Sequence, residues 1–175
     1  MTRRRGLGLA VLGGLALLMA VNLPRTLTQV DALGPIARGR AAPAFRLPAL
    51  AGGEVALGDL RGSVVLVDFW ASWCEPCVVQ LPHVERLARR FASRGLRVLA
   101  VNAGEPRADV ERFVRRAGLS GVTVLLDGEG VVGARYGVRT LPFTLVVDRG
   151  GLVRDAAIGP RGERRLAAMV EPWLR

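Results

Sequence analysis

The chain has 175 residues, half of them apolar, and its 25 basic residues outnumber 15 acidic ones. This length and composition fit one globular domain with a short extension and exclude a largely disordered chain. Two cysteines and one histidine are too few for a four-ligand structural zinc site, and we expect neither a metal nor another cofactor. The net charge is +10, but from Ala41 onward 19 arginines face only 14 acidic residues. We therefore expect no nucleic-acid partner.

The first 24 residues resemble a membrane anchor. Three arginines at positions 3–5 precede an uncharged, mostly apolar run over residues 6–23. A helix of that length rises ~27 Å, close to the thickness of a bilayer core. Arginines ahead of such a span stay in the cytoplasm, which predicts a single-pass plasma-membrane protein whose remainder lies on the extracytoplasmic, periplasmic side. A cleaved signal peptide is the alternative, although Leu18 fits poorly three residues before a cleavage site at Ala20.

Residues 25–41 are rich in glycine, proline and arginine and predict a linker, and residues 42–175 predict one folded domain. Strand and helix patterns alternate through that domain, which is typical of an α/β fold. The pattern predicts strands at 44–47 and 54–57 around a Gly52-Gly53 turn, then a strand at 64–70, a helix at 74–93, a strand at 96–101, a helix at 106–117, a strand at 122–126, a short helix at 131–136, paired strands at 143–147 and 152–158, and a closing helix at 161–174.

The sequence Trp73-Cys74-Glu75-Pro76-Cys77 carries the chemistry, because it places two cysteines where a buried strand leads into a helix. The free N–H groups of a helix N-terminus stabilise a thiolate, which should lower the pKa of Cys74. Cys77 lies one turn later and is close enough to form a disulfide with Cys74. We expect thiol–disulfide exchange in which Cys74 is attacked or attacks and Cys77 resolves the mixed disulfide.

Residues 67–77, together with the motifs at 42–45, 57–62, 98–102 and 136–142, resemble the TlpA/ResA-like membrane-anchored thiol-disulfide oxidoreductases of the thioredoxin superfamily. The resemblance implies a thioredoxin-like α/β fold with an N-terminal β-hairpin extension and a central helix-strand insertion at about 105–126. It also implies a cis-proline at Pro142, facing the cysteines. Leu141, directly before that proline, would offer backbone groups to a bound peptide.

The resemblance also assigns Trp73, Glu75 and Pro76 to the substrate-contacting surface around the cysteines. It implies a monomer that reduces protein disulfides outside the cytoplasm, with the haem-attachment disulfide of apocytochrome c as one substrate class. Electrons would come from a transmembrane thiol-reducing protein. A disulfide-donating oxidant, a peroxiredoxin-type peroxidase and a redox-inactive interaction or chaperone domain are the alternatives, although the peroxidase motif is missing here.

Asp68 lies inside the apolar strand that precedes the motif, where a charged carboxylate is costly. Thioredoxins have an aspartate at this spacing, whereas many ResA-like chains have a glutamate three residues after the second cysteine. That position is Gln80 here, and an amide cannot exchange a proton near neutral pH. We therefore expect Asp68, with a raised pKa, to accept the proton of Cys77. The alternative is a structural aspartate paired with an arginine.

Overall fold

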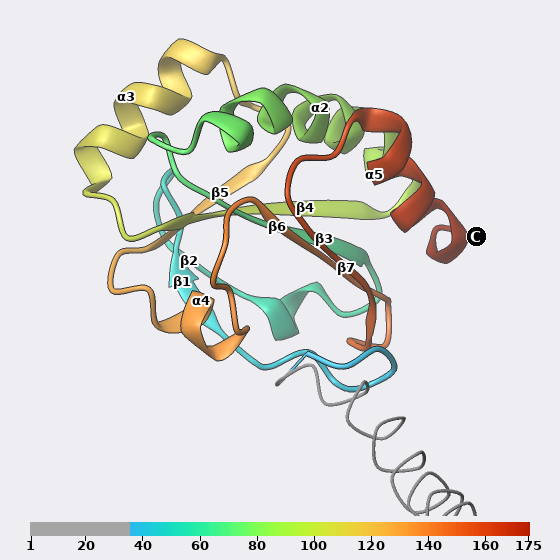
Figure 1. The fold of residues 1–175 in the computed structure, drawn as a ribbon. Helices are drawn as coiled ribbons and strands as arrows, with labels where there is room; N and C mark the ends of the chain where they lie inside the picture. Colours follow the sequence, from blue (N-terminus) through green and yellow to red (C-terminus); the bar gives the residue numbers. More distant parts are fainter. Residues whose placement is uncertain (1–35) are drawn as a thin grey trace, which may run out of the picture.

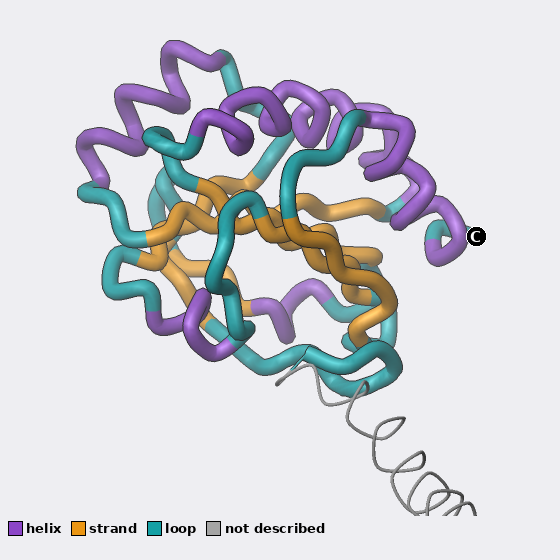
Figure 2. The backbone as a smooth tube through the Cα atoms, viewed as in Figure 1, coloured by secondary structure: helices purple, strands orange, loops and turns teal. Residues whose placement is uncertain are grey.

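The protein, seen in a computed structural model that describes residues 36–175, is built on a five-stranded sheet with the strand order β5-β4-β3-β6-β7. The strands are β3 (Val64–Trp70), β4 (Leu96–Ala103), β5 (Thr123–Asp127), β6 (Phe143–Val147) and β7 (Val153–Ile158). Strands β3, β4 and β5 run parallel, while β6 is antiparallel to both β3 and β7. Figure 2 shows the strands as a central layer between helical and loop segments. The domain is therefore α/β with an antiparallel edge, as the sequence predicts.

Strand β3 lies at the centre of the sheet and is buried on both faces, because its side chains alternate between two apolar cores. Val65, Val67 and Phe69 belong to the core on one face. Val64 and Leu66 belong to the core on the other. The apolar run of β3, interrupted only by Asp68, thus suits its central position.

Helices α2 (Glu75–Phe91), α3 (Arg107–Ala117) and α5 (Glu163–Val170) lie on one side of the sheet, and the short α4 (Val131–Arg135) lies on the other (Figure 1). Three 3₁₀ segments, Leu57–Leu60, Ala92–Arg94 and Glu171–Trp173, follow β2, α2 and α5. The last of these contains Pro172, which ends the α-helical hydrogen bonding before the predicted boundary at 174.

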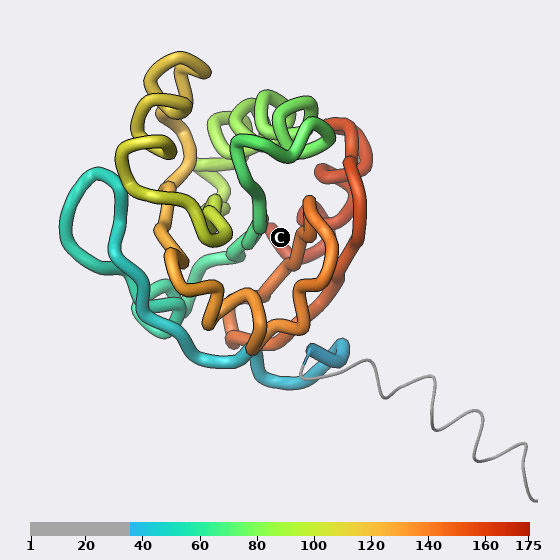
Figure 3. The backbone as a smooth tube through the Cα atoms, turned by 60° about the vertical axis from the view of Figure 1, so that its left-hand side comes forward, coloured from blue at the N-terminus to red at the C-terminus, as the bar shows by residue number. Residues whose placement is uncertain are grey.

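The predicted N-terminal hairpin is present as β1 (Arg46–Pro48) and β2 (Glu54–Ala56), which pair antiparallel around the Gly52-Gly53 turn. It lies beside the edge strand β5, where Ala49 bridges Leu125 (Figure 3). The predicted helix-strand insertion is present as α3 and β5, and β5 completes the sheet beside β4. The hairpin and the insertion therefore cover the same edge of the domain.

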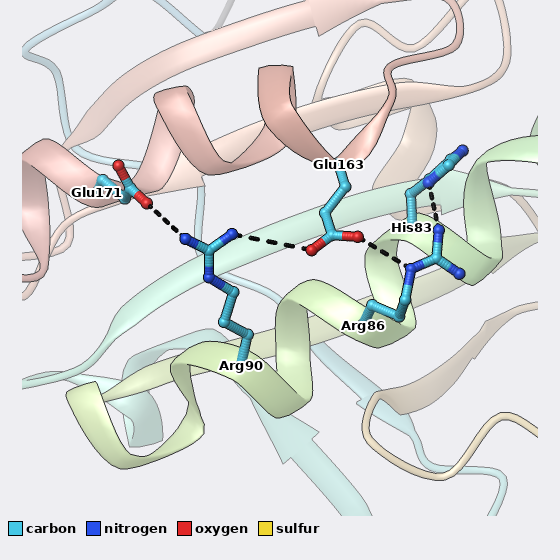
Figure 4. Close-up of polar contacts among 5 residues, drawn as sticks. All are labelled: His83, Arg86, Arg90, Glu163 and Glu171. Carbon is cyan, nitrogen blue, oxygen red and sulfur yellow. Dashed lines mark hydrogen bonds and ion pairs between the residues drawn. The ribbon is translucent and has the colours of Figure 1, made fainter.

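Arginines on α2 tie this helix to α5 (Figure 4). Arg86 and Arg90 both pair with Glu163, and Arg90 also reaches Glu171. Exposed pairs of this kind contribute about 0–1 kcal/mol each. Most of the adhesion between the helices comes instead from the apolar core beneath them, to which Leu87 and Leu166 contribute.

The chain enters the domain along the β6–β7 hairpin. The N–H of Gly39 donates to the carbonyl of Val153 at 2.7 Å, and the N–H of Ala42 donates to that of Gly151 at 2.9 Å. The end of the predicted linker is thus packed on the domain. Within residues 36–175 no helix is long and apolar enough to cross a membrane. The predicted anchor, residues 1–24, lies outside the described residues.

Candidate active site

Cys74 and Cys77 form a disulfide at the N-terminus of α2, with their Cα atoms 5.2 Å apart. Cys74 is the N-cap residue, and its Sγ accepts a hydrogen bond from the N–H of Cys77 at 3.3 Å. Pro76 occupies the first turn, where its missing N–H leaves no helical hydrogen bond unmade. The helix N-terminus therefore directs backbone donors at the first cysteine, as its sequence position predicts.

The disulfide lies at the boundary between the core and an exposed apolar surface. Cys77 is 1% exposed and Cys74 5%, and both pack in a core cluster with Trp70 and Leu81. Trp73, by contrast, is 71% exposed. Five large apolar side chains of the described residues are exposed, and four of them come from this region or from the end of β7: Trp73, Val78, Val79 and Ile158.

The Leu141–Pro142 peptide bond is cis, as the family resemblance predicts. Pro142 is buried and directly precedes β6, whose first residue pairs with Phe69 near the end of β3. Since β3 leads into the cysteine loop, this register brings the cis-proline to the same end of the sheet as the disulfide. Leu141 is half-buried, and its N–H and C=O have no hydrogen-bond partner within residues 36–175. These two groups are free to pair with another strand.

Asp68 is fully buried beneath α2, and burial raises its pKa from 3.8 to about 7. Its Oδ1 accepts hydrogen bonds from the Gln80 amide at 2.6 Å and from the Thr144 hydroxyl at 2.8 Å, and both lower the pKa again in part. Its Oδ2 is buried with no partner among the described residues. None of the ion pairs in residues 36–175 involves Asp68, which speaks against the alternative of a structural aspartate paired with an arginine.

Asp68 and Cys77 share one side of the β3–α2 layer. Asp68 and Trp70 are two residues apart on β3 and so face the same way, and Trp70 packs in the cluster that contains Cys77. Gln80, which contacts Asp68, is one helical turn after Cys77 and on the same face of α2. The Asp68 carboxyl and Cys77 therefore both lie in the layer between β3 and α2.

Gln80 has a role that its sequence position alone did not indicate. Besides donating to Asp68, its side-chain carbonyl accepts the backbone N–H of Arg161 at 2.7 Å. The amide thus ties the loop before α5 to the buried carboxyl. A second unforeseen group is Glu105, which binds the loop before Cys74. Both contacts join residues far apart in sequence, so no local pattern could reveal them.

The remaining predicted site residues lie at the surface. Glu75 is exposed in the first turn of α2, directly after Cys74, and Pro76 beside it is also exposed. The single histidine of the sequence, His83, is not among the predicted site residues; it is half-buried on α2, and its Nδ1 accepts a hydrogen bond from Arg86 at 2.6 Å (Figure 4). Among residues 36–175 no cluster of three potential metal ligands is present.

Comparison with known proteins matches residues 38–156 to the AhpC/TSA family. A thiol-disulfide oxidoreductase ResA of Geobacillus thermodenitrificans is 39% identical over 124 residues, which cover 71% of each chain. The protein of the same name from Bacillus subtilis is 34% identical and covers 73% of this chain and 71% of its own.

Solved structures agree with this relationship. The crystal structure of a putative thiol:disulfide interchange protein DsbE from Chlorobium tepidum is 33% identical and superposes with a TM-score of 0.76. The match covers 80% of this chain and 99% of that one. Together with the disulfide-bonded Cys74–Cys77 pair on a thioredoxin-like fold, these similarities show that the chain belongs to the AhpC/TSA family and is a ResA-like thiol-disulfide oxidoreductase.

Proposed function

We propose that this protein reduces disulfides of other proteins on the extracytoplasmic side of the plasma membrane, to which residues 1–24 anchor it and residues 25–41 link the domain. The observation that carries the proposal is the asymmetry of the cysteine pair. Cys74 borders the exposed surface at a helix N-terminus, while Cys77 is buried one helical turn before Gln80, whose amide binds the buried Asp68. Such a pair suits attack by the outer thiol and resolution by the inner one.

The reaction proceeds in two balanced steps. The Cys74 thiolate attacks one sulfur of the substrate disulfide, forming a mixed disulfide and releasing the other substrate sulfur as a thiolate that takes up a proton. Cys77 then loses its proton to the Asp68 carboxylate, and its thiolate attacks the sulfur of Cys74. This forms the Cys74–Cys77 disulfide and releases the second substrate sulfur as a thiolate, which takes up a proton. A carboxyl with a pKa of about 7 suits this transfer near neutral pH.

The substrate is a polypeptide held around Cys74. The exposed Trp73 supplies apolar contact area, with Glu75 and Pro76 at its rim. The free backbone groups of Leu141, next to Pro142, pair with an extended substrate segment as an added strand would. This arrangement recognises an unfolded or loop segment around the substrate disulfide, and needs no cofactor.

Family membership and the charge beside Cys74 support the proposal that electrons flow from this protein to its substrate. Glu75 places a carboxylate next to the thiolate, which destabilises the reduced, charged form and favours a reductant. The oxidised protein then needs a thiol-reducing membrane protein to restore it. Among substrates we propose the Cys-x-x-Cys-His haem-attachment disulfide of apocytochrome c, as the family resemblance implies.

Measuring the reduction potential of the Cys74–Cys77 pair tests the direction. A value near ~ −270 mV supports the reductant, and one near ~ −120 mV overturns it in favour of an oxidant. The reduced protein should also cleave a disulfide-bonded Cys-x-x-Cys-His peptide faster than the same peptide with its residues scrambled. Equal rates for the two peptides would overturn the proposal that apocytochrome c is the substrate, but would leave the proposed disulfide-reducing activity unaffected.

A further inference from the structure

The carboxylate of Glu105 fastens the loop that carries Cys74 to the end of β4. Its Oε2 accepts the backbone N–H of Ser72 at 2.7 Å and the side-chain amide of Asn102 at 2.6 Å. Its Oε1 accepts the hydroxyl of Ser72. The Asn102 side-chain carbonyl in turn accepts the N–H of Glu105 at 3.3 Å. One carboxylate thus takes three hydrogen bonds, two of them from the same loop residue.

The contact acts on the reactive cysteine through a short, tight loop. Ser72 is two residues before Cys74, and the N–H of Cys74 closes a turn onto the carbonyl of Ala71 at 3.2 Å. Asn102 is paired in register with Trp70, the last residue of β3. Because Glu105 binds both Ser72 and Asn102, it holds the turn from which Cys74 enters α2 to the end of β4.

The charge of Glu105 is not cancelled by an ion pair with any residue in 36–175. Its partners are the uncharged Ser72 and Asn102. Glu105 is half-buried, so water screens its charge only in part. A carboxylate at this position opposes a negative charge on Cys74, against the favourable effect of the helix N-terminus.

We propose that Glu105 is a positioning residue for Cys74: its three hydrogen bonds fix the cysteine loop, and its charge limits how much of Cys74 is thiolate at neutral pH. Glu105 is the residue at which the predicted insertion begins, so the insertion is coupled to Cys74 through Ser72. The proposal rests on the thiol–disulfide exchange activity, but it does not depend on which way electrons flow.

Four variants separate the charge from the hydrogen bonds. Glu105→Gln removes the charge and keeps an oxygen that can accept the Ser72 N–H. Glu105→Ala removes both, whereas Ser72→Ala removes only one hydrogen bond and keeps the charge. Glu54→Gln is the control, since it deletes an exposed carboxylate on the hairpin, outside the loop contact.

The readout is the alkylation rate of Cys74 in the fully reduced full-length protein across pH 5–10. In Glu105→Gln and Glu105→Ala the midpoint of this profile should move to lower pH, with an about threefold higher rate at pH 7. Ser72→Ala and Glu54→Gln should keep the wild-type midpoint. An unchanged midpoint in Glu105→Gln overturns the electrostatic role of Glu105.

Insulin-disulfide reduction tests the positioning role. Glu105→Ala should lose about tenfold in kcat/KM, while Glu105→Gln keeps most of it through the remaining hydrogen bond. Equal activities of Glu105→Ala and wild type would overturn the positioning role. Failure of the proposed function is distinguishable, because it would show as an oxidising potential of the wild-type protein and would leave these alkylation profiles unaffected.

Discussion

Replacing Asp68 by asparagine should make the stability of the oxidised protein respond differently to pH. The buried carboxyl has a pKa of about 7, raised from 3.8, so the folded protein holds a proton that the unfolded chain has released. Stability is lost wherever the folded state binds more protons than the unfolded state and the pH rises. The contribution of Asp68 to the free energy of unfolding is therefore fully present below about pH 4 and is lost as the pH rises from about 4 to 7.

The size of this change in stability follows from the shift in the pKa of Asp68. Roughly three pKa units at 1.36 kcal/mol each amount to about 4 kcal/mol above pH 7. Asparagine avoids this cost and keeps an oxygen for the hydrogen bonds from Gln80 and Thr144. Its NH₂ group replaces the unpartnered Oδ2 and leaves a buried donor unsatisfied, which costs about 1–3 kcal/mol. The variant should be more stable than wild type by about 1–3 kcal/mol at pH 8 and less stable by a similar amount near pH 4.

Urea denaturation of the oxidised, full-length protein at pH 4–8 measures this difference, with the disulfide intact so that the cysteines do not titrate. Asp59→Asn is the control, because Asp59 is exposed and only loosely paired with Arg46 at 3.7 Å. The difference in free energy of unfolding between Asp59→Asn and wild type should not change between pH 4 and pH 8. If the Asp68→Asn curve ran parallel to wild type over the whole range, the buried carboxyl would not titrate near pH 7 and the proton-transfer role would be refuted.

The exchange activity, the substrate surface and the membrane location give the remaining predictions. Iodoacetamide should alkylate Cys74 in the reduced protein much faster than Cys77, and the reverse order would exchange their roles. Asp68→Asn should slow resolution of a mixed disulfide about 100-fold at pH 7, measured by stopped-flow fluorescence; an unchanged rate would make Asp68 purely structural. Trp73→Ala should reduce kcat/KM for insulin about tenfold yet leave exchange with glutathione within twofold, since only a polypeptide reaches the exposed ring. Cell fractionation should recover a full-length N-terminus in membranes, whereas a soluble form beginning near Val21 would indicate cleavage.

The sequence was sufficient for the features that depend on local chemistry. The apolar run of β3, the helix after it and the cysteine spacing predict the disulfide at a helix N-terminus, and the structure confirms this placement. Asp68 could be recognised because a carboxyl inside an apolar strand is unusual. The cis-proline followed from family resemblance, since an X–Pro bond alone does not determine its isomer.

The contacts that tune the site could not be predicted in the same way. Gln80 stands where many ResA-like chains have a glutamate, so the sequence alone indicates only the loss of an acid. In the structure its side-chain amide hydrogen-bonds to Asp68, Thr144 and the backbone of Arg161. Glu105 binds Ser72 across 33 positions of sequence. Both contacts depend on how α2, β3 and β4 pack together, and only the folded arrangement brings their polar groups within hydrogen-bond distance.

The entry of the chain along the β6–β7 hairpin would determine which way the domain faces if residues 1–24 anchor it to a membrane, as proposed above. In the antiparallel pairing of β3 with β6, Val147 lies opposite Val65, so the turn after β6 is at the end of the sheet remote from Cys74. About seven strand residues, or roughly 20 Å, separate the two ends. A membrane tether joined at Ile36 would hold the domain from behind, with the disulfide directed outward. Soluble partners would reach Cys74 without hindrance. An electron donor in the same membrane would instead need thiols that extend well above the lipid surface, or the domain would have to reorient about its linker to bring Cys74 toward the membrane.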